Sequence, residues 1–335
     1  MRSQKELILA TKPFVTEDRA KTWRLLFSTF VALGIALSGA VMAPVLPIKL
    51  VFALCAGLIW TRVFIFFHDY QHKAILWDST PGAIIMNCVG FMTLTPPSVW
   101  RQTHDYHHQN NTKMLGAQIG SYPLVSIGIY KALTPAQQKM YAFARHPLTI
   151  FFGYFTVFLG GMCLAAFKRA PREHWQGLAN FVTHFSMAGL LTWFFGFETA
   201  FVVLIFPNMV ASAFGGYLFY AQHNFPDIKI KGRRDWNYAF AALRGSSMME
   251  MSPLMHWVTG NIGYHHVHHL NHKIPFYNLP AAMDAIPELQ DPGRTSLMPS
   301  DMWACMRLKL WDPDRNRMVT WDEAFTETEA KAQAV

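Results

Sequence analysis

The sequence predicts an all-α integral membrane protein, with four transmembrane helices, further re-entrant or interfacial helices, and a cytosolic helical cap. Three observations predict this fold class. Of the 335 residues, 52% are hydrophobic and only 15% are charged. The apolar residues are gathered into long blocks, as in proteins that cross a membrane several times. More than half of the 15 histidines lie in three dense clusters, each at the end of a predicted helix.

The first third of the chain predicts two transmembrane helices. Residues 1–24 carry six Lys or Arg residues and no apolar core, so we expect a cytosolic N-terminal segment rather than a cleavable signal peptide. The apolar runs at 25–46 and 48–68 are long enough to span a bilayer. The connection around Pro47 is too short for anything but a tight hairpin, and Lys49 lies at its tip.

Two further apolar segments are not predicted to cross the membrane. Residues 82–95 are too short and are stopped by Pro96-Pro97, which predicts a re-entrant or in-plane segment. Residues 148–167 are long enough to span, but a crossing there would place the last histidine cluster on the side opposite the first two. We therefore expect a re-entrant hairpin at 148–167, loosened by its three glycines.

The apolar runs at 178–196 and 199–221 predict the other two transmembrane helices. The hairpin between them has Glu198 at its tip and no Lys or Arg. With four crossings, Lys49 is the only one of the 29 Lys and Arg residues on the outside, which the positive-inside rule favours. Both termini are then cytosolic. Arg62, near the inner end of the second helix, is expected to snorkel toward the headgroups.

The histidine clusters have spacings that bring side chains to one face of a helix. His68 and His72 are four residues apart, so they share a helical face and can grip one metal ion. The other two clusters have the pattern HxxHH, in which the adjacent pair diverges by about 100°. Adjacent histidines can therefore reach two different metals, and three clusters suit two metal ions better than one. The HxxHH histidines are His104, His107, His108, His265, His268 and His269. His266 is left over and is not expected to be a ligand.

The donor type indicates which metal is bound. Neutral imidazoles suit Fe, Zn, Cu and Ni, whereas Mg and Ca prefer oxygen ligands. Structural zinc sites normally use four ligands with some Cys, and the four cysteines here are far apart with no CxxC pair. Bis-His haem needs ligands that face each other within the bilayer, whereas these lie at helix ends. A pair of non-haem irons, able to activate O2 and attack a hydrocarbon, explains the number of histidines.

Three residues outside the cluster spacing are further candidates. His223 emerges from the last span and is interpreted as a ninth ligand, although a lone interfacial histidine is also common. Asp69 and Asp105 each follow the first histidine of a cluster. Each either accepts a hydrogen bond from the other ring nitrogen of a ligand, or is a solvated carboxylate or helix N-cap. We interpret the remaining histidines as structural: His146, His174, His184, His256 and His272.

The clusters and their flanks resemble the membrane fatty acid desaturase family, which has three histidine boxes, and most of all its acyl-lipid omega-6 (delta-12) type. The likeness covers about residues 40–285. The first two boxes are His68-Asp69 to His72, and Trp100-Arg101 to His107-His108 with Asn111-Thr112 after it. The third runs from His256-Trp257 through Gly260-Asn261-Ile262-Gly263 to His268-His269-Leu270, followed by Ile274-Pro275 and Tyr277. One departure is Gln71, where members of this type often have a small residue.

The resemblance implies a non-haem di-iron enzyme, with two Fe ions, that uses O2 and two electrons to place a cis double bond in a fatty acyl lipid. It places the metal ligands at His68, His72, His104, His107, His108, His223, His265, His268 and His269. A separate electron donor is required, ferredoxin or cytochrome b5. The membrane desaturase domain is expected at 25–285, followed by a cytosolic tail at 286–335.

Several alternatives remain open from the sequence. A hydroxylase, acetylenase or carotenoid oxygenase would share the fold, and a metal transporter would use histidines at several depths. The formal charge of +8 fits positive-inside loops of a multi-pass bacterial inner-membrane protein with a cytosolic active site, rather than nucleic-acid binding. The basic run Lys229–Arg234 either steers an acidic donor or contacts anionic headgroups.

Overall fold

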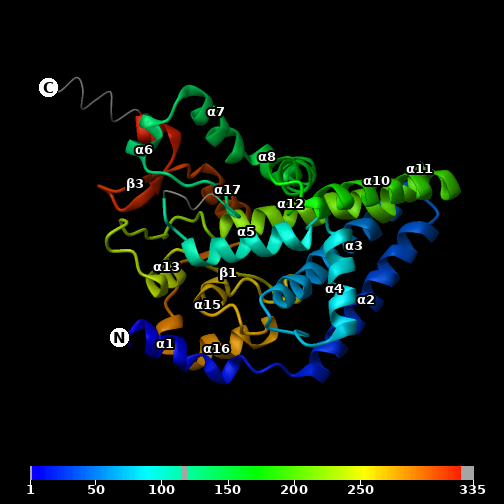
Figure 1. Ribbon diagram of the computed structural model, residues 1–335, viewed down its shortest axis with the longest axis horizontal. Coiled ribbons are helices and arrows are strands. Elements are labelled where there is room, and N and C mark those ends of the chain that lie inside the picture. Colours follow the sequence, from blue (N-terminus) through cyan, green and yellow to red (C-terminus); the bar gives the residue numbers. More distant parts are fainter. Residues whose placement is uncertain (1, 115–118, 326–335) are drawn as a thin grey trace.

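Four long apolar helices form the frame of the protein in a computed structural model, which describes residues 2–114 and 119–325 (Figure 1). The helices able to cross a membrane are α2 (Arg19–Met42), α3 (Leu46–Gln71), α10 (Trp175–Phe195) and the helix Phe197–Ala221. The last of these consists of α11 (Phe197–Ala200), the π-helical η3 (Phe201–Ile205) and α12 (Phe206–Ala221). The predicted all-α membrane fold with four spans is therefore confirmed.

The helix α3 is the most enclosed of the spans. In its apolar stretch 61% of the residues are buried, compared with 28% in α2 and 17% in α10, so α3 is the central span and the others present wide faces to lipid. Phe27 and Trp193 are among the side chains on those outer faces. The helices α3 and α12 approach closely at Gly57, where a Cβ would lie 2.6 Å from the Val210 side chain and 2.8 Å from the Pro207 carbonyl oxygen.

The side chain of Arg62 does not snorkel to the headgroups, so that prediction was wrong. It is only 3% exposed, and its Nε donates to the hydroxyl of Thr29 on α2 at 3.0 Å. Its Nη1 donates to the backbone carbonyl of Trp257 in the cap, and the guanidinium lies 4.6 Å from the centre of the Trp257 ring. The sequence could not show these partners because they come from distant segments. Arg62 thereby joins α2 and α3 to the cap.

The helices α4 (Thr80–Met92) and α5 (Pro97–Asn110) are bent by 89° relative to each other. Pro96 and Pro97 prevent α4 from continuing. Leu94, in the connection between the two helices, takes a positive φ of 56°. In Figure 1, α4 lies across the direction of the spans, whereas α5 runs alongside α12. The bend therefore directs α5 and its histidines toward the end of α3.

The predicted re-entrant hairpin at 148–167 is not formed. The backbone is helical through α8 (Pro147–Phe151), the π-helical η2 (Tyr154–Ala165) and α9 (Ala166–Arg169), apart from a turn at Phe152. The glycines do not reverse the chain, because the backbone continues through them as a hydrogen-bonded π-helix. Figure 1 views this rod nearly along its axis, whereas α10 and α12 run across the picture. It is not one of the four helices long and apolar enough to span.

The remaining elements form a cap at the histidine end of the spans. Its helices are α13 (Tyr238–Arg244), α14 (Pro253–Val258), α15 (His265–Leu270), η4 (Phe276–Asn278), α16 (Leu279–Ala285), η5 (Pro287–Leu289) and α17 (Pro299–Arg307). The helices α1 (Gln4–Ala10), η1 (Lys12–Phe14), α6 (Ile127–Ala132) and α7 (Pro135–Ala144) border it. Four short strands, not predicted from the sequence, pair as β1 (Met248–Glu250) parallel to β2 (Arg294–Ser296) and β3 (Leu310–Asp312) antiparallel to β4 (Arg317–Val319). Residues 326–335 of the predicted tail lie outside the described residues.

The position of Arg62 predicts a loss of stability on its removal. We expect Arg62→Ala to lower the free energy of unfolding by about 2 kcal/mol, because hydrogen bonds from a charged donor contribute roughly 1.5–3 kcal/mol and the Trp257 carbonyl loses its partner. Chemical unfolding of the purified protein in detergent measures this. Arg24→Ala removes an exposed cation of α2 and should change the stability by less than about 0.5 kcal/mol. An equal loss of stability in both variants would contradict the conclusion that Arg62 joins α2 and α3 to the cap.

Candidate metal centre

Nine histidine side chains converge where α3, α5, the end of α12 and the cap helix α15 meet. They form two groups, and within each group the ligand atoms lie within 4.8 Å of one another. All nine are buried except His223, which is half-buried. The first group is His68, His72, His104, His108 and His268, and the second is His107, His223, His265 and His269. The structure thus brings together all nine histidines that the sequence singled out as ligands.

The two HxxHH clusters each divide between the two groups. On α5, His104 and His108 are one helical turn apart and join the first group, whereas His107 joins the second. On α15 the division is reversed: His265 and His269 join the second group, whereas His268 joins the first. Adjacent residues on a helix diverge by about 100°, which aims neighbouring imidazoles at two different points.

The contacts between ring nitrogens fit a shared metal ion. The Nε2 of His108 lies 3.2 Å from the Nε2 atoms of both His104 and His268. The Nε2 of His223 lies 3.0 Å from that of His107 and 2.9 Å from that of His265. A nitrogen has one proton or one lone pair to offer, so hydrogen bonds alone cannot satisfy such a trio. Nitrogens about 2.1 Å from one metal and at right angles are roughly 3.0 Å apart, which matches these distances.

The ring nitrogens of the two groups also include buried atoms without a hydrogen-bond partner. Both nitrogens of His72 and the Nε2 of His269 are examples. Leaving such atoms unpaired is costly, so a bound cation explains them. Burial lowers the pKa of His223 to about 4, and it lowers the pKa values of the α5 and α15 members well below the ordinary value. These seven imidazoles are therefore neutral near pH 7, which is the form that binds a metal.

The carboxylate of Asp69 orients one of these histidines. Its Oδ1 lies 3.0 Å from the Nδ1 of His68, and its Oδ2 accepts a hydrogen bond of 2.7 Å from the backbone N–H of Phe276. The side chain is only 1% exposed, so it is not the solvated carboxylate that the sequence left open. An Nδ1–H that donates to Asp69 leaves the Nε2 of His68 free for a metal.

The carboxylate of Asp105 does not form a comparable hydrogen bond to a histidine. Its Oδ1 lies 4.0 Å from the Nδ1 of His72, and the Asp105 side chain is 49% exposed. This distance is too long for a hydrogen bond. The geometry therefore favours the alternative of a solvated carboxylate for Asp105.

Two contacts to the ligand histidines were missed in the sequence. The carbonyl oxygen of Gly245 accepts from the Nδ1 of His223 at 3.1 Å, which leaves the Nε2 of His223 for a metal. No sequence signal marks this backbone group. The ring of Trp100 stacks on that of His104, with 4.5 Å between the ring centres. Here the four-residue spacing on one helix was a signal that could have predicted the contact.

The other histidines lie outside both groups. His266 is buried with its Nε2 3.0 Å from the Leu289 carbonyl oxygen, and burial lowers its pKa to about 4. His272 packs closer to the centre than its sequence position suggested, because its ring centre is 4.6 Å from that of His72 and 5.1 Å from that of His108. It therefore touches two members of the first group without joining it.

An apolar cavity of about 450 Å³ reaches both groups of histidines. Its wall includes His68 and His104 from the first group and His265 from the second. Phe64 and Trp100, in edge-to-face contact at 4.9 Å, form part of the same wall. Val157 and Met162 of η2 and Ala211 and Leu218 of α12 also line the cavity. A cavity of this volume and composition suits an apolar ligand.

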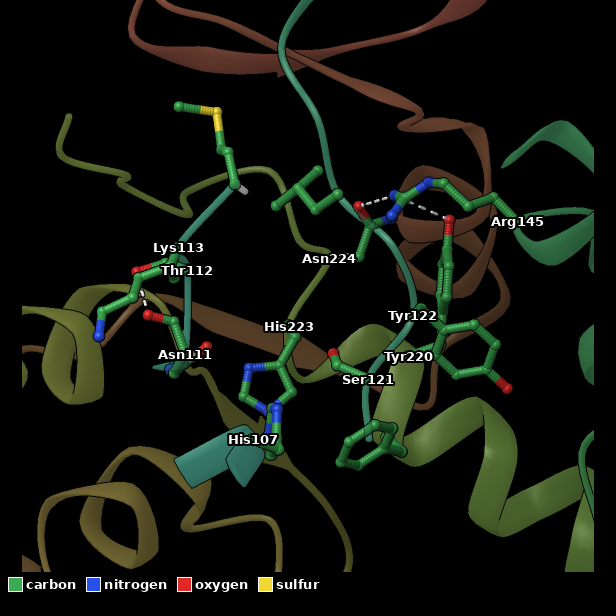
Figure 2. Close-up of a pocket in the computed structure, with 13 residues that line it drawn as sticks. His107, Asn111, Thr112, Lys113, Ser121, Tyr122, Arg145, Tyr220, His223 and Asn224 are labelled. Carbon is green, nitrogen blue, oxygen red and sulfur yellow. Dashed lines mark hydrogen bonds between the residues drawn. The ribbon is translucent and has the colours of Figure 1, made fainter. Parts of the chain in front are cut away.

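A second, smaller pocket touches the second group only (Figure 2). The rings of His107 and His223 form one part of its lining, and Asn111 and Lys113 lie on the same wall. Its volume of about 30 Å³ has room for water-sized molecules, compared with about 450 Å³ for the apolar cavity. The two groups thus have different surroundings.

Comparison with known proteins connects this centre to lipid chemistry. A family model described as fatty acid desaturase matches residues 40–299. A fatty acid desaturase of Bacillus subtilis (strain 168) is 29% identical over 272 residues, which are 80% of this chain and 76% of the relative. A chloroplastic omega-6 fatty acid desaturase of Spinacia oleracea is 25% identical over 92% of this chain and 69% of its own. An sn-1 acyl-lipid omega-3 desaturase (ferredoxin) of Nostoc sp. (strain 36) is 26% identical over 70% and 66%.

The division into two groups predicts how a single substitution changes metal content. The unmodified protein should hold about two metal ions per chain, and His268→Ala should lower this toward one while abolishing activity, because only the first group loses a ligand. Elemental analysis of purified protein measures the content. His272→Ala is the matched control, since it removes a neighbouring ring that belongs to neither group and should keep both metals. Equal metal loss in the two variants would contradict the assignment of His268, but not His272, as a metal ligand.

Proposed function

The chain belongs to the fatty acid desaturase family, and we propose that it is a membrane-bound non-haem di-iron enzyme that introduces a cis double bond into a fatty acyl chain, using O2 and two electrons from an external donor. The apolar cavity carries this proposal. Its wall contains histidines of both groups, so an acyl chain in the cavity would lie directly beside both metal positions.

The ligand set supports iron as the metal. All nine candidate ligands are imidazoles, which excludes the oxygen-preferring Mg and Ca. A structural zinc site is closed with four ligands, commonly including Cys, whereas the first group offers five nitrogens and no Cys belongs to either group. Two irons, one at each group, account for both the number and the division of the histidines.

The reaction divides between the metals and the chain. A bound pair of irons would supply the O2 activation needed to remove hydrogen from an unactivated C–H bond. In the balanced reaction, O2, two electrons and two protons take up two hydrogens from adjacent carbons, and two water molecules are released. The residues of the chain position the substrate, because Phe64 and Trp100 hold the acyl chain against the histidine wall. The apolar wall also excludes water from the reacting carbons.

The acyl carrier and the electron donor are part of the same proposal. Relatives named for sn-1 acyl-lipid and oleoyl-lipid substrates favour a chain esterified in a membrane lipid. The name of one relative includes ferredoxin, and ferredoxin or cytochrome b5 would supply electrons here. Both are one-electron carriers, so each double bond consumes two reduced donor molecules.

The proposed location is a bacterial inner membrane, with both termini and the metal centre on the cytosolic side. The two hairpin tips meet at the other end of the spans, where the Nζ of Lys49 lies 2.6 Å from the Oε1 of Glu198. This pairing supports a topology in which both tips lie on one side of the membrane, away from the histidines. The basic residues of the cap then face the cytosol, as the positive-inside rule favours.

Expression in a bacterial host that lacks polyunsaturated lipids tests the activity. We expect a new double bond in the lipid acyl chains, detected by gas chromatography and mass spectrometry of their fatty acids. A host that carries His268→Ala should show none, because the first metal position is incomplete. A product with an added oxygen would show a hydroxylase instead, and an unchanged lipid profile with metal-loaded protein would contradict the proposal.

The proposed orientation predicts the side of two reporter fusions. Green fluorescent protein fused after Arg169 should fluoresce, since this position is expected in the cytosol and the protein folds there. Alkaline phosphatase fused after Lys49 should be active, because that hairpin tip is expected outside. An alkaline phosphatase fused after Arg169 should be inactive. If it were active, the helical segment from Pro147 would cross the membrane, and the four-span topology would be wrong.

A further inference from the structure

A basic surface lies beside the second group of histidines. It is formed by Lys113, which lies over the indole of Trp236, and by Lys231, Arg233 and Arg234 of the run that precedes Trp236 in the chain. The Nζ of Lys113 is 3.9 Å from the centre of the Trp236 ring. Lys231, Arg233 and Arg234 are exposed, and neither arginine forms an ion pair with any residue in the described part of the chain.

The basic surface is directly bonded to the helix that carries His107. The indole Nε1 of Trp236 donates to the backbone carbonyl of Asn111 at 2.9 Å. Asn111 follows the last residue of α5 and lies four residues after His107, which is about 6 Å along the helix axis. Trp236 therefore contacts the chain about one helical turn from His107, a member of the second group.

A second connection leads from the same asparagine to His223. The Nδ2 of Asn111 donates to the hydroxyl of Ser246 at 3.0 Å. The residue before it, Gly245, accepts the hydrogen bond from His223. Figure 2 shows Asn111 and Lys113 on the pocket wall beside the rings of His107 and His223. Two ligands of the second group are thus tied to the basic surface through one residue.

The charge and the place of this surface indicate its partner. Asp227 and Asp235 flank the run, but they are outnumbered by the cations, and nearby Arg244 is already paired with Asp291 at 3.0 Å. In Figure 1, the loop that precedes α13 lies at the end of the molecule farthest from α11. This loop carries the exposed arginines, so the surface points away from the bilayer. A soluble acidic protein fits this position better than lipid headgroups do.

We propose that this basic surface docks an acidic one-electron carrier protein, and that electrons enter the metal centre on the side of the second group of histidines. The proposal rests on the proposed desaturase function. Each docked carrier is oxidised by one electron and leaves, and two such events per double bond supply the two electrons. The oxidant is O2, which takes up the two electrons, two protons from solvent and the two hydrogens of the acyl chain and is released as two water molecules.

Charge reversal of the surface tests the proposal. The variant K231E/R233E/R234E should bind an acidic [2Fe–2S] ferredoxin at least tenfold more weakly than the unmodified protein at low salt, measured with the metal-loaded protein in lipid nanodiscs. The affinity of the unmodified protein should fall with rising salt, whereas the weak binding of the variant should not. Turnover driven by ferredoxin should fall with the affinity. Turnover driven by dithionite with a small uncharged mediator should stay the same.

The control variant K139E/K168E/R172E carries the same charge change on exposed residues of another part of the surface. It should keep the affinity for ferredoxin within about twofold. An equal loss of ferredoxin affinity in both variants would contradict the docking site, and so would an equal loss of ferredoxin-driven and mediator-driven turnover. The cations would then contact lipid headgroups or stabilise the fold. If the unmodified protein formed no double bond with any reductant, the proposed function would fail, and the binding comparison would still decide the docking site.

Discussion

The structure depends on one constraint, which is that nine imidazoles, eight of them buried, must be aimed at two points. A buried imidazole without a partner is costly, so these side chains are tolerable only if the fold delivers all of them to a place where something binds them. That requirement explains the backbone around the site. The bend of 89° between α4 and α5 brings one HxxHH cluster to the end of α3, and the cap brings the other from more than 150 residues away.

The reversed division of the two HxxHH clusters gives the two metal positions different neighbours. The first group borders the apolar cavity through His68 and His104 and has the buried carboxylate of Asp69 against His68. The second borders the same cavity through His265 and the small pocket through His107 and His223, and a backbone carbonyl lies behind His223. A carboxylate makes a ligand more basic than a neutral carbonyl does. The two metals of one centre would therefore differ in electron density, with substrate contact mainly at the first and the basic surface at the second.

The sequence predicts local periodicity well and long-range partners poorly, and the residues show why. Eight of the nine histidines could be named because helical spacing is a local property, and the ninth, His223, because it follows the last span. The four spans could be named because bilayer thickness sets their length. The hairpin at 148–167 was predicted so that all the histidine clusters lie on one side of the membrane, whereas the segment is helical, mostly as a π-helix, and does not reverse. Arg62 was expected in the headgroups because its partners, Thr29 and Trp257, come from segments far away in the chain. Likewise, the carbonyl of Gly245 carries no side-chain signal at all.

The same long-range contacts explain how a very short helix can hold ligands in place. The helix α15 has six residues and no side-chain N-cap, and helices of this length are unstable alone. It is held by the bond from His266 to the Leu289 carbonyl, while Arg62 and Asp69 secure the segments on either side through Trp257 and Phe276. All three anchors end on backbone atoms, which are fixed more rigidly than side chains. A metal that binds α15 together with α3 and α5 adds a further link between cap and spans, so metal binding and cap folding stabilise each other.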